Sequence, residues 1–444
     1  MFRKLAIRGV ATFLLVLTAV PAAAANLPLE GKAAILMDGT TGQILYDYNG
    51  NEKNYPASTT KLLTALVAVE HAAKPDLTQM IKVSAKAVDM PPDSSACYLN
   101  AGEEQTLKNL LYGLLLASGN DCANAIAEGL TNGNTQQFVQ WMNETAVRVG
   151  ATSTHFTNPH GYHEDGHFTT ARDLAVISKA ALNNPSVREI SSTHDFFWPG
   201  KSEQNGVYYN HTRMLFDFPA ADAEKNGFTV VAGKTGFTDE AQHTLVTGAE
   251  HNGLWLIGVV MGETSLYGHY DDMQKLLAYG FKNFTTRKVV TDGTLFGEVA
   301  VTGAKETSVK AVVKGDFVAS VPTSGTAAVT TEAKLQLSVA APVTQGQKLG
   351  DLEIKQDGKL LGTLPLYASA DVAVRPSPFK GLLSGTLAVL KWLAYIFIGL
   401  LVFRTTVKTV RRVLRRSRRK GQPNYRPAPR QNRGTIDLYR TRSR

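Results

Sequence analysis

The chain has 444 residues, of which 43% are hydrophobic and 19% charged, and its formal net charge is +9. This length is typical of two or three domains, and the apolar fraction excludes a disordered or collagen-like chain. The charge is uneven, because residues 404–444 hold 15 basic residues and one acidic residue, whereas residues 26–403 hold 29 basic and 37 acidic residues. A body with a net charge of −8 predicts no nucleic-acid partner.

Residues 1–25 have the pattern of a secretory signal peptide. Arg3, Lys4 and Arg8 precede an apolar run over residues 11–20, and small residues follow up to Ala25, the simplest cleavage point. The alternative is an uncleaved anchor helix, but the apolar run is short for a membrane span. We therefore expect the mature body to work outside the cytoplasmic membrane.

The main body, residues 26–286, shows strand patterns at both ends and helix patterns between them. Apolar runs at 33–37 and 44–46 predict a hairpin, and two further strands flank Asn252-Gly253 within 245–261. Apolar residues at helical spacing predict helices over 59–71, 107–116, 138–149, 172–182 and 273–284. This arrangement predicts an α/β (α+β) domain with an antiparallel sheet.

A second domain is predicted over residues 287–375. Short Val- and Thr-rich runs are broken by Gly and Asp every 8–12 residues or so, with no long helical pattern, which is typical of a small all-β sandwich. Residues 376–380 contain Pro376, Ser377 and Pro378 and are interpreted as a linker.

Residues 381–403 form a second apolar stretch, long enough at about 1.5 Å per residue to cross a bilayer. Lys391 lies in its middle and opposes insertion, and Trp392 and Tyr395 lie mid-span rather than at the interfaces. The basic tail, residues 404–444, favours a spanning helix with the tail in the cytoplasm. A helix lying in the membrane interface is the alternative, and both tether the body to the membrane.

The two cysteines are Cys97 and Cys122. An oxidising compartment would permit a disulfide bond between them, but the sequence does not give their distance. A disulfide and two free thiols both remain open.

Ser58 and Lys61 stand three residues apart at the start of the first predicted buried helix, so their side chains share one face. A serine hydroxyl is a weak nucleophile until a neighbouring base takes its proton. Lysine serves as that base only if its pKa falls from about 10.4, which burial, a helix N-terminus and a second cation each favour. A Ser-x-x-Lys spacing arises by chance in a chain of this length, so the signal is weak alone.

Two further motifs strengthen the hypothesis. Ser118-Gly119-Asn120 follows an apolar helix and offers a hydroxyl that can relay a proton and an amide that can hold a substrate carbonyl and Lys61. Lys234-Thr235-Gly236 follows a predicted strand and offers an ammonium for a substrate carboxylate, a hydroxyl, and a glycine that lets another chain lie close. This three-part set, in this order, is that of penicillin-binding proteins and class A β-lactamases.

Over about residues 27–375 the chain resembles the D-alanyl-D-alanine carboxypeptidases, the low-molecular-mass penicillin-binding proteins of peptidase family S11. The resemblance implies the penicillin-binding-protein/β-lactamase-like transpeptidase fold with a helical subdomain, followed by a small β-domain. Beyond the three motifs, it rests on residues 94–95, 102–103, 110–121, 154–161, 167–174, 233–241 and 342–366.

The resemblance also implies roles for the residues of the first two motifs. Ser58 is expected to be the acylated nucleophile and Lys61 its base. Ser118 is expected to relay the proton, and Asn120 to act as the amide clamp.

The third motif is implied to bind the substrate, with Lys234 as the carboxylate anchor and Thr235 and Gly236 beside it. Backbone N–H groups of Ser58 and Phe237 would form the oxyanion hole. Phe237 stands where one well-known member has histidine, a change that a backbone donor tolerates but that leaves side-chain selectivity open.

Other candidate sites are weaker. His155, His160, His163 and His167 lie close together, but their spacing matches no H-E-x-x-H zinc pattern, so we expect no metal and no cofactor. Glu164 would suit the deacylating base of a β-lactamase, yet its surroundings resemble the carboxypeptidase loop.

The sequence therefore predicts a bacterial serine-type D-Ala-D-Ala carboxypeptidase on the outer face of the cytoplasmic membrane. Its expected partners are peptidoglycan stem pentapeptides ending in D-Ala-D-Ala, β-lactam antibiotics and the membrane, and its oligomeric state stays open. A D,D-endopeptidase or β-lactamase on the same scaffold and a non-catalytic penicillin-binding wall scaffold are the alternatives. The apolar stretch and basic tail depart from the amphipathic helix with which members often end, so the mode of membrane attachment also stays open.

Overall fold

The computed structural model describes residues 27–198, 206–324, 329–376 and 378–418. The predicted signal peptide, residues 1–25, and the end of the basic tail, residues 419–444, lie outside the described residues. The chain divides into a compact unit that holds the strands and helices up to Val372 and a second unit that holds the C-terminal helix.

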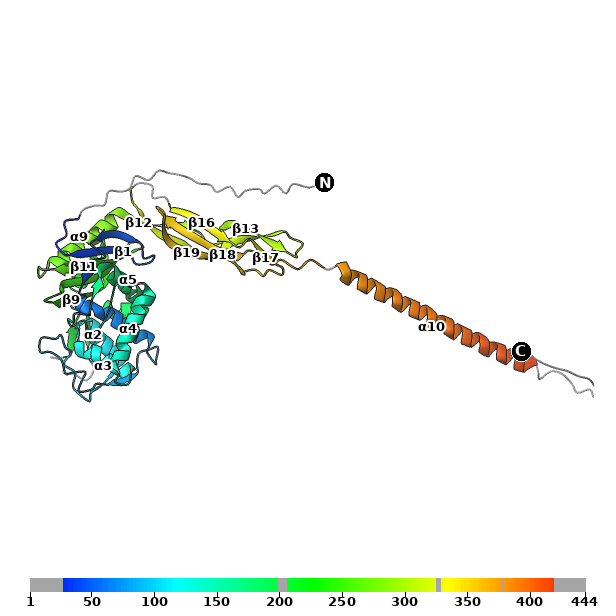
Figure 1. Cartoon of the computed structure of the whole chain (residues 1–444), viewed down its shortest axis with the longest axis horizontal. Coiled ribbons are helices and arrows are strands. Elements are labelled where there is room, and N and C mark those ends of the chain that lie inside the picture. Colours follow the sequence, from blue (N-terminus) through cyan, green and yellow to red (C-terminus); the bar gives the residue numbers. More distant parts are fainter. Residues whose placement is uncertain (1–26, 199–205, 325–328, 377, 419–444) are drawn as a thin grey trace, which may run out of the picture. The chain divides into compact units, whose positions relative to one another are not determined.

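Five strands form an antiparallel sheet: β1 (Ala33–Asp38), β2 (Ile44–Tyr48), β9 (Thr229–Thr238), β10 (Gln242–His251) and β11 (Leu254–Glu263). Their order is β2-β1-β11-β10-β9, so β9 is an edge strand (Figure 1). β1 is buried at every position because both faces of the sheet are covered. Since side chains alternate along a strand, Ile35 and Met37 pack with one core cluster and Leu36 with the other.

Two long helices cover the two faces of this sheet. α9 (Gly268–Asn283) packs on β10 and β11 and contributes Met273, Leu276 and Leu277 to their shared core. α5 (Ala171–Leu182) packs on β1 and β11 and joins the sheet to a helical region (Figure 1). The predicted α+β fold with an antiparallel sheet is confirmed.

The helical region is arranged around α1 (Lys61–Glu70), which is buried from Lys61 to Ala68. Its largely apolar sequence fits this central place, because helices pack against several sides of it. The other elements are η1, a short 3₁₀ helix (Ala57–Thr60), α2 (Leu107–Leu115), α3 (Asn120–Leu130), α4 (Thr135–Val149), α6 (Pro185–Ser191), α7 (Met214–Asp217), η2 (Ala220–Asp222) and α8 (Ala223–Asn226), with the strand pairs β3 (Lys53–Asn54) and β6 (Thr169–Thr170), β4 (Met80–Lys82) and β5 (Glu104–Thr106), and β7 (Asp195–Phe197) and β8 (Val207–Tyr209).

The five predicted helices correspond to α1, α2, α4, α5 and α9, and the predicted hairpin to β1 and β2. No helix is predicted at α3, which begins at Asn120, the last residue of the second motif. α3 is rich in alanine and small polar residues, so its buried face lacks the long apolar side chains that mark the other helices.

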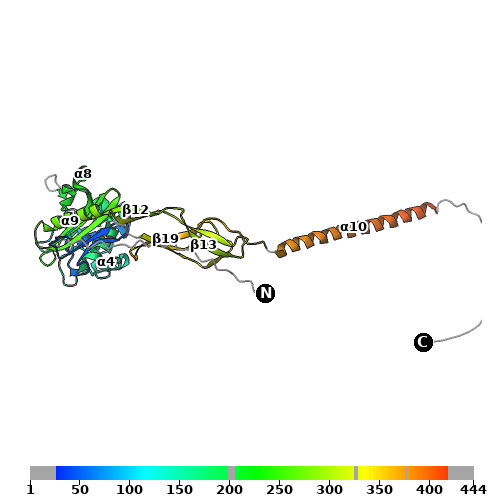
Figure 2. The same cartoon turned by 90° about the horizontal axis from the view of Figure 1, so that it is seen from above.

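The second domain is built only of strands among its described residues (Figure 2). Six of them form a sheet in the order β16-β18-β19-β14-β13-β17, and two more pair as β12-β15. Alternate residues such as Val299, Val301, Leu352 and Ile354 are buried and form its core. The strands are β12 (Phe284–Val290), β13 (Leu295–Thr302), β14 (Ser308–Val313), β15 (Phe317–Pro322), β16 (Val329–Leu335), β17 (Ser338–Ala340), β18 (Lys348–Gln356) and β19 (Lys359–Ala368).

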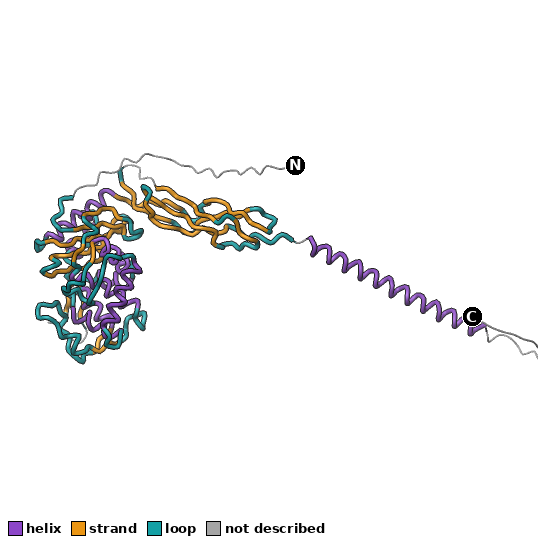
Figure 3. The backbone as a smooth tube through the Cα atoms, in the orientation of Figure 1, coloured by secondary structure: helices purple, strands orange, loops and turns teal. Residues whose placement is uncertain are grey.

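α10 (Pro378–Arg418) is one uninterrupted helix (Figure 3). Within the described residues, α10 is the one helix long and apolar enough to cross a membrane, over its stretch 385–416, where an 18-residue window has a mean hydropathy of 2.1. Large apolar side chains such as Leu400 and Phe403 are exposed along it. The helix begins inside the predicted linker, residues 376–380, and continues past the predicted apolar stretch, residues 381–403, into the basic tail.

Candidate active site

The first motif lies where the helical region meets the edge of the five-stranded sheet. Ser58 is in η1, which packs on β9, and Lys61 is the first residue of α1. Ala57, directly before Ser58, has a positive φ of 47°, which is strained for a residue with a side chain. Gly161 fits beside it, because a Cβ there would lie 1.9 Å from the Ala57 carbonyl oxygen.

Lys61 reaches back along the helix face to Ser58, as the three-residue spacing predicts. Its Nζ donates to Ser58 Oγ at 2.7 Å and to the backbone carbonyl of His160 at 2.8 Å. The Lys61 side chain is fully buried. A lysine in this place can exchange a proton with the serine without help from solvent.

The second motif brings its side chains to the same place. Ser118 is buried and has a positive φ of 61°, so a second strained residue stands at the site. Its Oγ accepts a hydrogen bond from Lys234 Nζ at 3.0 Å. Asn120 is also buried, and its Oδ1 has no hydrogen-bond partner among the described residues. That carbonyl is an acceptor for an incoming amine or amide N–H.

The third motif occupies the edge strand β9. Lys234 is buried at a position that pairs with Val246 of β10, and its Nζ also donates to the Thr235 carbonyl at 2.9 Å. Gly236 lies against the first motif, since a Cβ there would be 2.9 Å from Ser58 N and 3.0 Å from the Pro56 carbonyl oxygen. A larger residue would push β9 away from Ser58.

Two lysines therefore share one buried site with no acidic partner, since neither forms an ion pair among the described residues. Burial and then the charge of Lys234 hold the pKa of Lys61 well below its usual value. Burial lowers the pKa of Lys234 to about 7. The lowered pKa of Lys61 increases the fraction present as the neutral amine, which is the form that can accept a proton.

A cavity of about 370 Å³ opens onto Ser58. Lys61, Ser118 and Lys234 are buried behind its wall. The wall contains three carboxylates, and Tyr162 and His163 lie close to two of them, Asp93 and Glu240. The lining residues are Ser58, Asp93, Ser94, Ser95, Asn120, Gly161, Tyr162, His163, Phe237, Thr238, Asp239 and Glu240.

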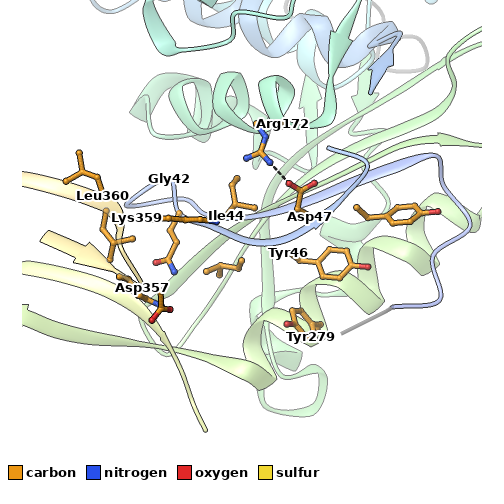
Figure 4. A pocket seen from close by; sticks show the side chains of 14 residues that line it. Gly42, Ile44, Tyr46, Asp47, Arg172, Tyr279, Asp357, Lys359 and Leu360 are labelled. Atoms are coloured by element: carbon orange, nitrogen blue, oxygen red, sulfur yellow. Dashed lines mark hydrogen bonds and ion pairs between the residues drawn. The ribbon is translucent and has the colours of Figure 1, made fainter. Parts of the chain in front are cut away.

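A larger cavity of about 820 Å³ lies beside β2 and the turn between β18 and β19 (Figure 4). An ion pair between Arg172 and Asp47 stands at its wall. None of its lining residues belongs to the three motifs. Size is therefore a poor guide here, and the smaller cavity at Ser58 is the candidate active site.

The histidines of the middle loop serve separate local contacts. His155 Nδ1 lies 2.8 Å from the Gly166 carbonyl, and His167 is buried between Thr60 and Thr157. Burial lowers the pKa of His160 and of His167 to about 3 in each case, so both are neutral. Neutral, separately bonded rings of this kind fit structural roles.

Two contributors were missed by sequence reasoning. The His160 carbonyl accepts a hydrogen bond from Lys61, but it is a backbone group and so cannot be predicted from the type of residue. Asp121 accepts backbone N–H groups from Cys97, Leu99 and Cys122 and so ties the loop before it to the start of α3. The only sequence signal for either was the resemblance of the surrounding segments to family S11.

Comparison with known proteins agrees with this geometry. The family model for D-alanyl-D-alanine carboxypeptidase, peptidase S11, matches residues 20–265, and that for the penicillin-binding protein 5 C-terminal domain matches residues 284–374. The D-alanyl-D-alanine carboxypeptidase DacF of Bacillus subtilis is 30% identical over 349 residues, which are 78% of this chain and 87% of that protein. DacA of Haemophilus influenzae is 30% identical over 352 residues, covering 78% of this chain and 86% of that protein.

A solved structure is similar as well. The crystal structure of penicillin binding protein 5 from Haemophilus influenzae aligns with a TM-score of 0.64 at 29% identity and covers 79% of this chain and 99% of that one. The chain therefore belongs to the serine D-alanyl-D-alanine carboxypeptidase family, peptidase S11, and carries the C-terminal domain of penicillin-binding protein 5.

Proposed function

We propose that this protein is a D-Ala-D-Ala carboxypeptidase that removes the terminal D-alanine from peptidoglycan stem pentapeptides through an acyl-enzyme on Ser58. The observation that carries the proposal is the 2.7 Å contact between Ser58 Oγ and the buried Lys61 Nζ, which forms no ion pair among the described residues. A neutral amine at this distance is a general base already in place.

In the acylation step Ser58 Oγ attacks the carbonyl carbon of the penultimate D-alanine. Its proton passes to the lone pair of neutral Lys61, while the second contact of Lys61, to the His160 carbonyl, holds the amine in position. Backbone N–H groups of Ser58 and Phe237, which both line the cavity, would stabilise the oxyanion. The C–N bond then breaks to leave an ester on Ser58.

The leaving amine of D-alanine needs a proton. Ser118 Oγ is bonded to Lys234 Nζ at 3.0 Å and is suited to pass a proton from the lysine pair to that amine. Water then attacks the ester, with Lys61 again taking the proton, and the shortened stem peptide leaves. Asn120, whose buried Oδ1 has no partner among the described residues, would accept a hydrogen bond from the bound peptide.

Substrate binding would use the free edge of β9. An extended peptide can add to an exposed strand through main-chain hydrogen bonds. Lys234 lies on this strand with Thr235 and Gly236, so its ammonium is available to the terminal carboxylate of D-Ala-D-Ala. A carboxylate beside Lys234 favours its charged form and raises its pKa from the lowered value of the empty site.

β-Lactams are expected to acylate Ser58 and to stay attached. A β-lactamase needs a base that activates water on the acyl-enzyme, and Glu164 was the sequence candidate. Its Oε1 accepts a hydrogen bond from Asn158 at 3.0 Å, and Glu164 is not among the residues that line the cavity. This placement favours the carboxypeptidase over the β-lactamase.

The test is to incubate the full chain in detergent with a stem pentapeptide and, separately, with labelled penicillin, beside Ser58→Ala. We expect free D-alanine and a stable label, both lost in the variant. Label without D-alanine release would favour an endopeptidase or a non-catalytic scaffold, and rapid loss of label a β-lactamase. D-Alanine release by Ser58→Ala would contradict the mechanism.

We also propose that α10 spans the cytoplasmic membrane and holds the catalytic domain on its outer face. The exposed apolar stretch of α10 gives way, still in the same helix, to Arg411, Arg412, Arg415 and Arg416. Arginines that follow a span directly favour the cytoplasmic side. The apolar stretch would thus cross the bilayer, and the basic end would remain inside.

Protease treatment of intact spheroplasts tests this orientation. A tag added after Arg444 is expected to stay protected while the catalytic domain is digested. If the tag is digested from outside, or if alkaline carbonate releases the protein, α10 lies in the interface instead.

A further inference from the structure

The two cysteines meet directly behind the candidate active site. Cys97 lies on the loop that follows Ser94 and Ser95, Cys122 lies in the first turn of α3, and both side chains are fully buried. Their sulfur atoms and a carboxylate oxygen of Asp121 all lie within 4.8 Å of one another.

Two glycines show that both sulfurs face the same point. A Cβ on Gly113 of α2 would lie 2.8 Å from Cys97 Sγ and 2.6 Å from Cys122 Sγ. A Cβ on Gly119 would lie 2.7 Å and 3.1 Å from the same two atoms. Atoms that each lie so near a shared point cannot be far apart, so the two sulfur atoms are within reach of a bond after a small rotation of the side chains.

Contacts of the main chain hold the two cysteines in this place. Asp121 accepts hydrogen bonds from the N–H groups of both Cys97 and Cys122 at 2.9–3.0 Å. The backbone N–H of Asn120 donates to the Ser95 carbonyl at 2.8 Å. The folded chain thus brings the cysteines together independently of any bond between them, which favours the correct pairing during folding.

We propose that Cys97 and Cys122 are joined by a disulfide bond in the mature protein. The inference rests on the proposed location outside the cytoplasm, where disulfides persist, and not on the reaction at Ser58. The oxidant is a disulfide-carrying thiol oxidoreductase. One cysteine thiolate attacks its disulfide, the second resolves the mixed disulfide, and the oxidoreductase takes up the two protons that the cysteines lose and leaves as a dithiol.

The bond would form before the domain closes. Both thiols are fully buried in the folded chain, and burial raises the pKa of the Cys122 thiol, so little reactive thiolate is available there. For the same reason a reductant added to the folded protein should act slowly. The disulfide is therefore structural rather than a rapidly reversible switch.

Its place gives it a specific effect on the site. Ser94 and Ser95 line the cavity at Ser58, and Asn120 starts the helix that carries Cys122. The bond would fasten one wall of the cavity to the second motif. A metal ion is a poorer occupant of this pocket, because the Asp121 carboxylate is already occupied by three backbone N–H groups.

The direct test is the intact mass of the full chain, purified from membranes without reductant and denatured in an alkylating reagent. We expect a mass lower by two hydrogen atoms than that of the dithiol and no alkyl groups, and two alkyl groups after prior reduction. Two alkyl groups without reduction, or zinc that co-purifies in equal amount, would overturn the proposal.

Thermal unfolding provides the second measurement. Full reduction should lower the melting temperature of the wild-type chain by roughly 5 °C or more, since the bond closes a loop of 26 residues counted from Cys97 to Cys122. The matched control is the double variant Cys97→Ala with Cys122→Ala, whose melting temperature should not respond to reductant. An equal response in both proteins would also overturn the proposal. D-Alanine release does not enter either readout, so a failure here is separate from a failure of the proposed function.

Discussion

Lysine behaves in opposite ways in the two domains of this protein. In the catalytic domain, Lys61 and Lys234 are buried and form no ion pair with any described residue, and burial lowers their pKa values. In the β-domain, Lys355 lies between Glu332 and Glu353 at 2.7 Å and 2.8 Å, and these hydrogen bonds raise its pKa to about 12.

The difference arises because the lysine of the β-domain is paired with acidic residues in solvent, whereas the lysines of the catalytic site are buried. On the β-sheet surface, opposite charges on neighbouring strands face each other in solvent, and such pairs contribute little to stability. In the catalytic domain the chain carries two cations into its interior, which costs free energy of folding unless the charge is given up. Burial therefore favours the neutral amine form of Lys61, which lies beside Ser58.

The largest expected effect comes from making the buried base permanently charged. Lys61→Arg keeps the hydrogen-bond donors but cannot accept a proton at physiological pH, so we expect penicillin acylation to slow by about 10²–10⁴-fold. The matched control is Lys355→Arg, which should acylate at the wild-type rate. Normal acylation in Lys61→Arg, with circular dichroism unchanged, would show that another group is the base.

A smaller effect is expected at the carboxylate anchor. Lys234→Gln removes the cation that would meet the terminal carboxylate, and we expect kcat/KM for the pentapeptide to fall by about 10–10²-fold. An analogue with a C-terminal methyl ester lacks that carboxylate and should lose much less between wild type and variant. Equal losses for both substrates would place the role of Lys234 in the chemistry rather than in recognition.

The two lowered pKa values predict a bell-shaped pH dependence of kcat/KM. Activity should fall as pH drops through the lowered pKa of Lys61, because its protonated form cannot take the serine proton. It should also fall as pH rises above about 7, where Lys234 of the free enzyme loses the charge that attracts the carboxylate. Lys234→Gln should remove the alkaline limb and, by removing the charge that lowers the pKa of Lys61, move the acid limb to higher pH. A profile of the methyl ester with the same alkaline limb would contradict this assignment.

The smallest effect is expected in the β-domain. Lys355→Gln removes two surface ion pairs and should leave both the melting temperature and D-alanine release unchanged within error. Glu332→Gln is the partner control. A clear loss of stability in either would mean that this cluster holds the β-sheet together.

The sequence predicts the helices, strands and motifs of the site better than it predicts the contacts between them. The apolar run after Lys61 is sufficient to predict a buried helix. The three-residue spacing of Ser58 and Lys61 is sufficient to predict that their side chains share one face of it. No local pattern shows that residue 234 reaches residue 118, because that contact depends on packing of a sheet edge against helices. The positive φ values at Ala57 and Ser118 also cannot be predicted from the sequence, because the surrounding fold imposes strain of this kind.

The proposed function depends on acylation of Ser58 with neutral Lys61 as the base. The most direct measurement is a peptide map of the penicillin adduct, taken at short times in wild type and in Lys61→Arg. We expect the adduct on the peptide that contains Ser58, formed rapidly in wild type and far more slowly in the variant. An adduct on another residue, or equal rates in the two proteins, would contradict it.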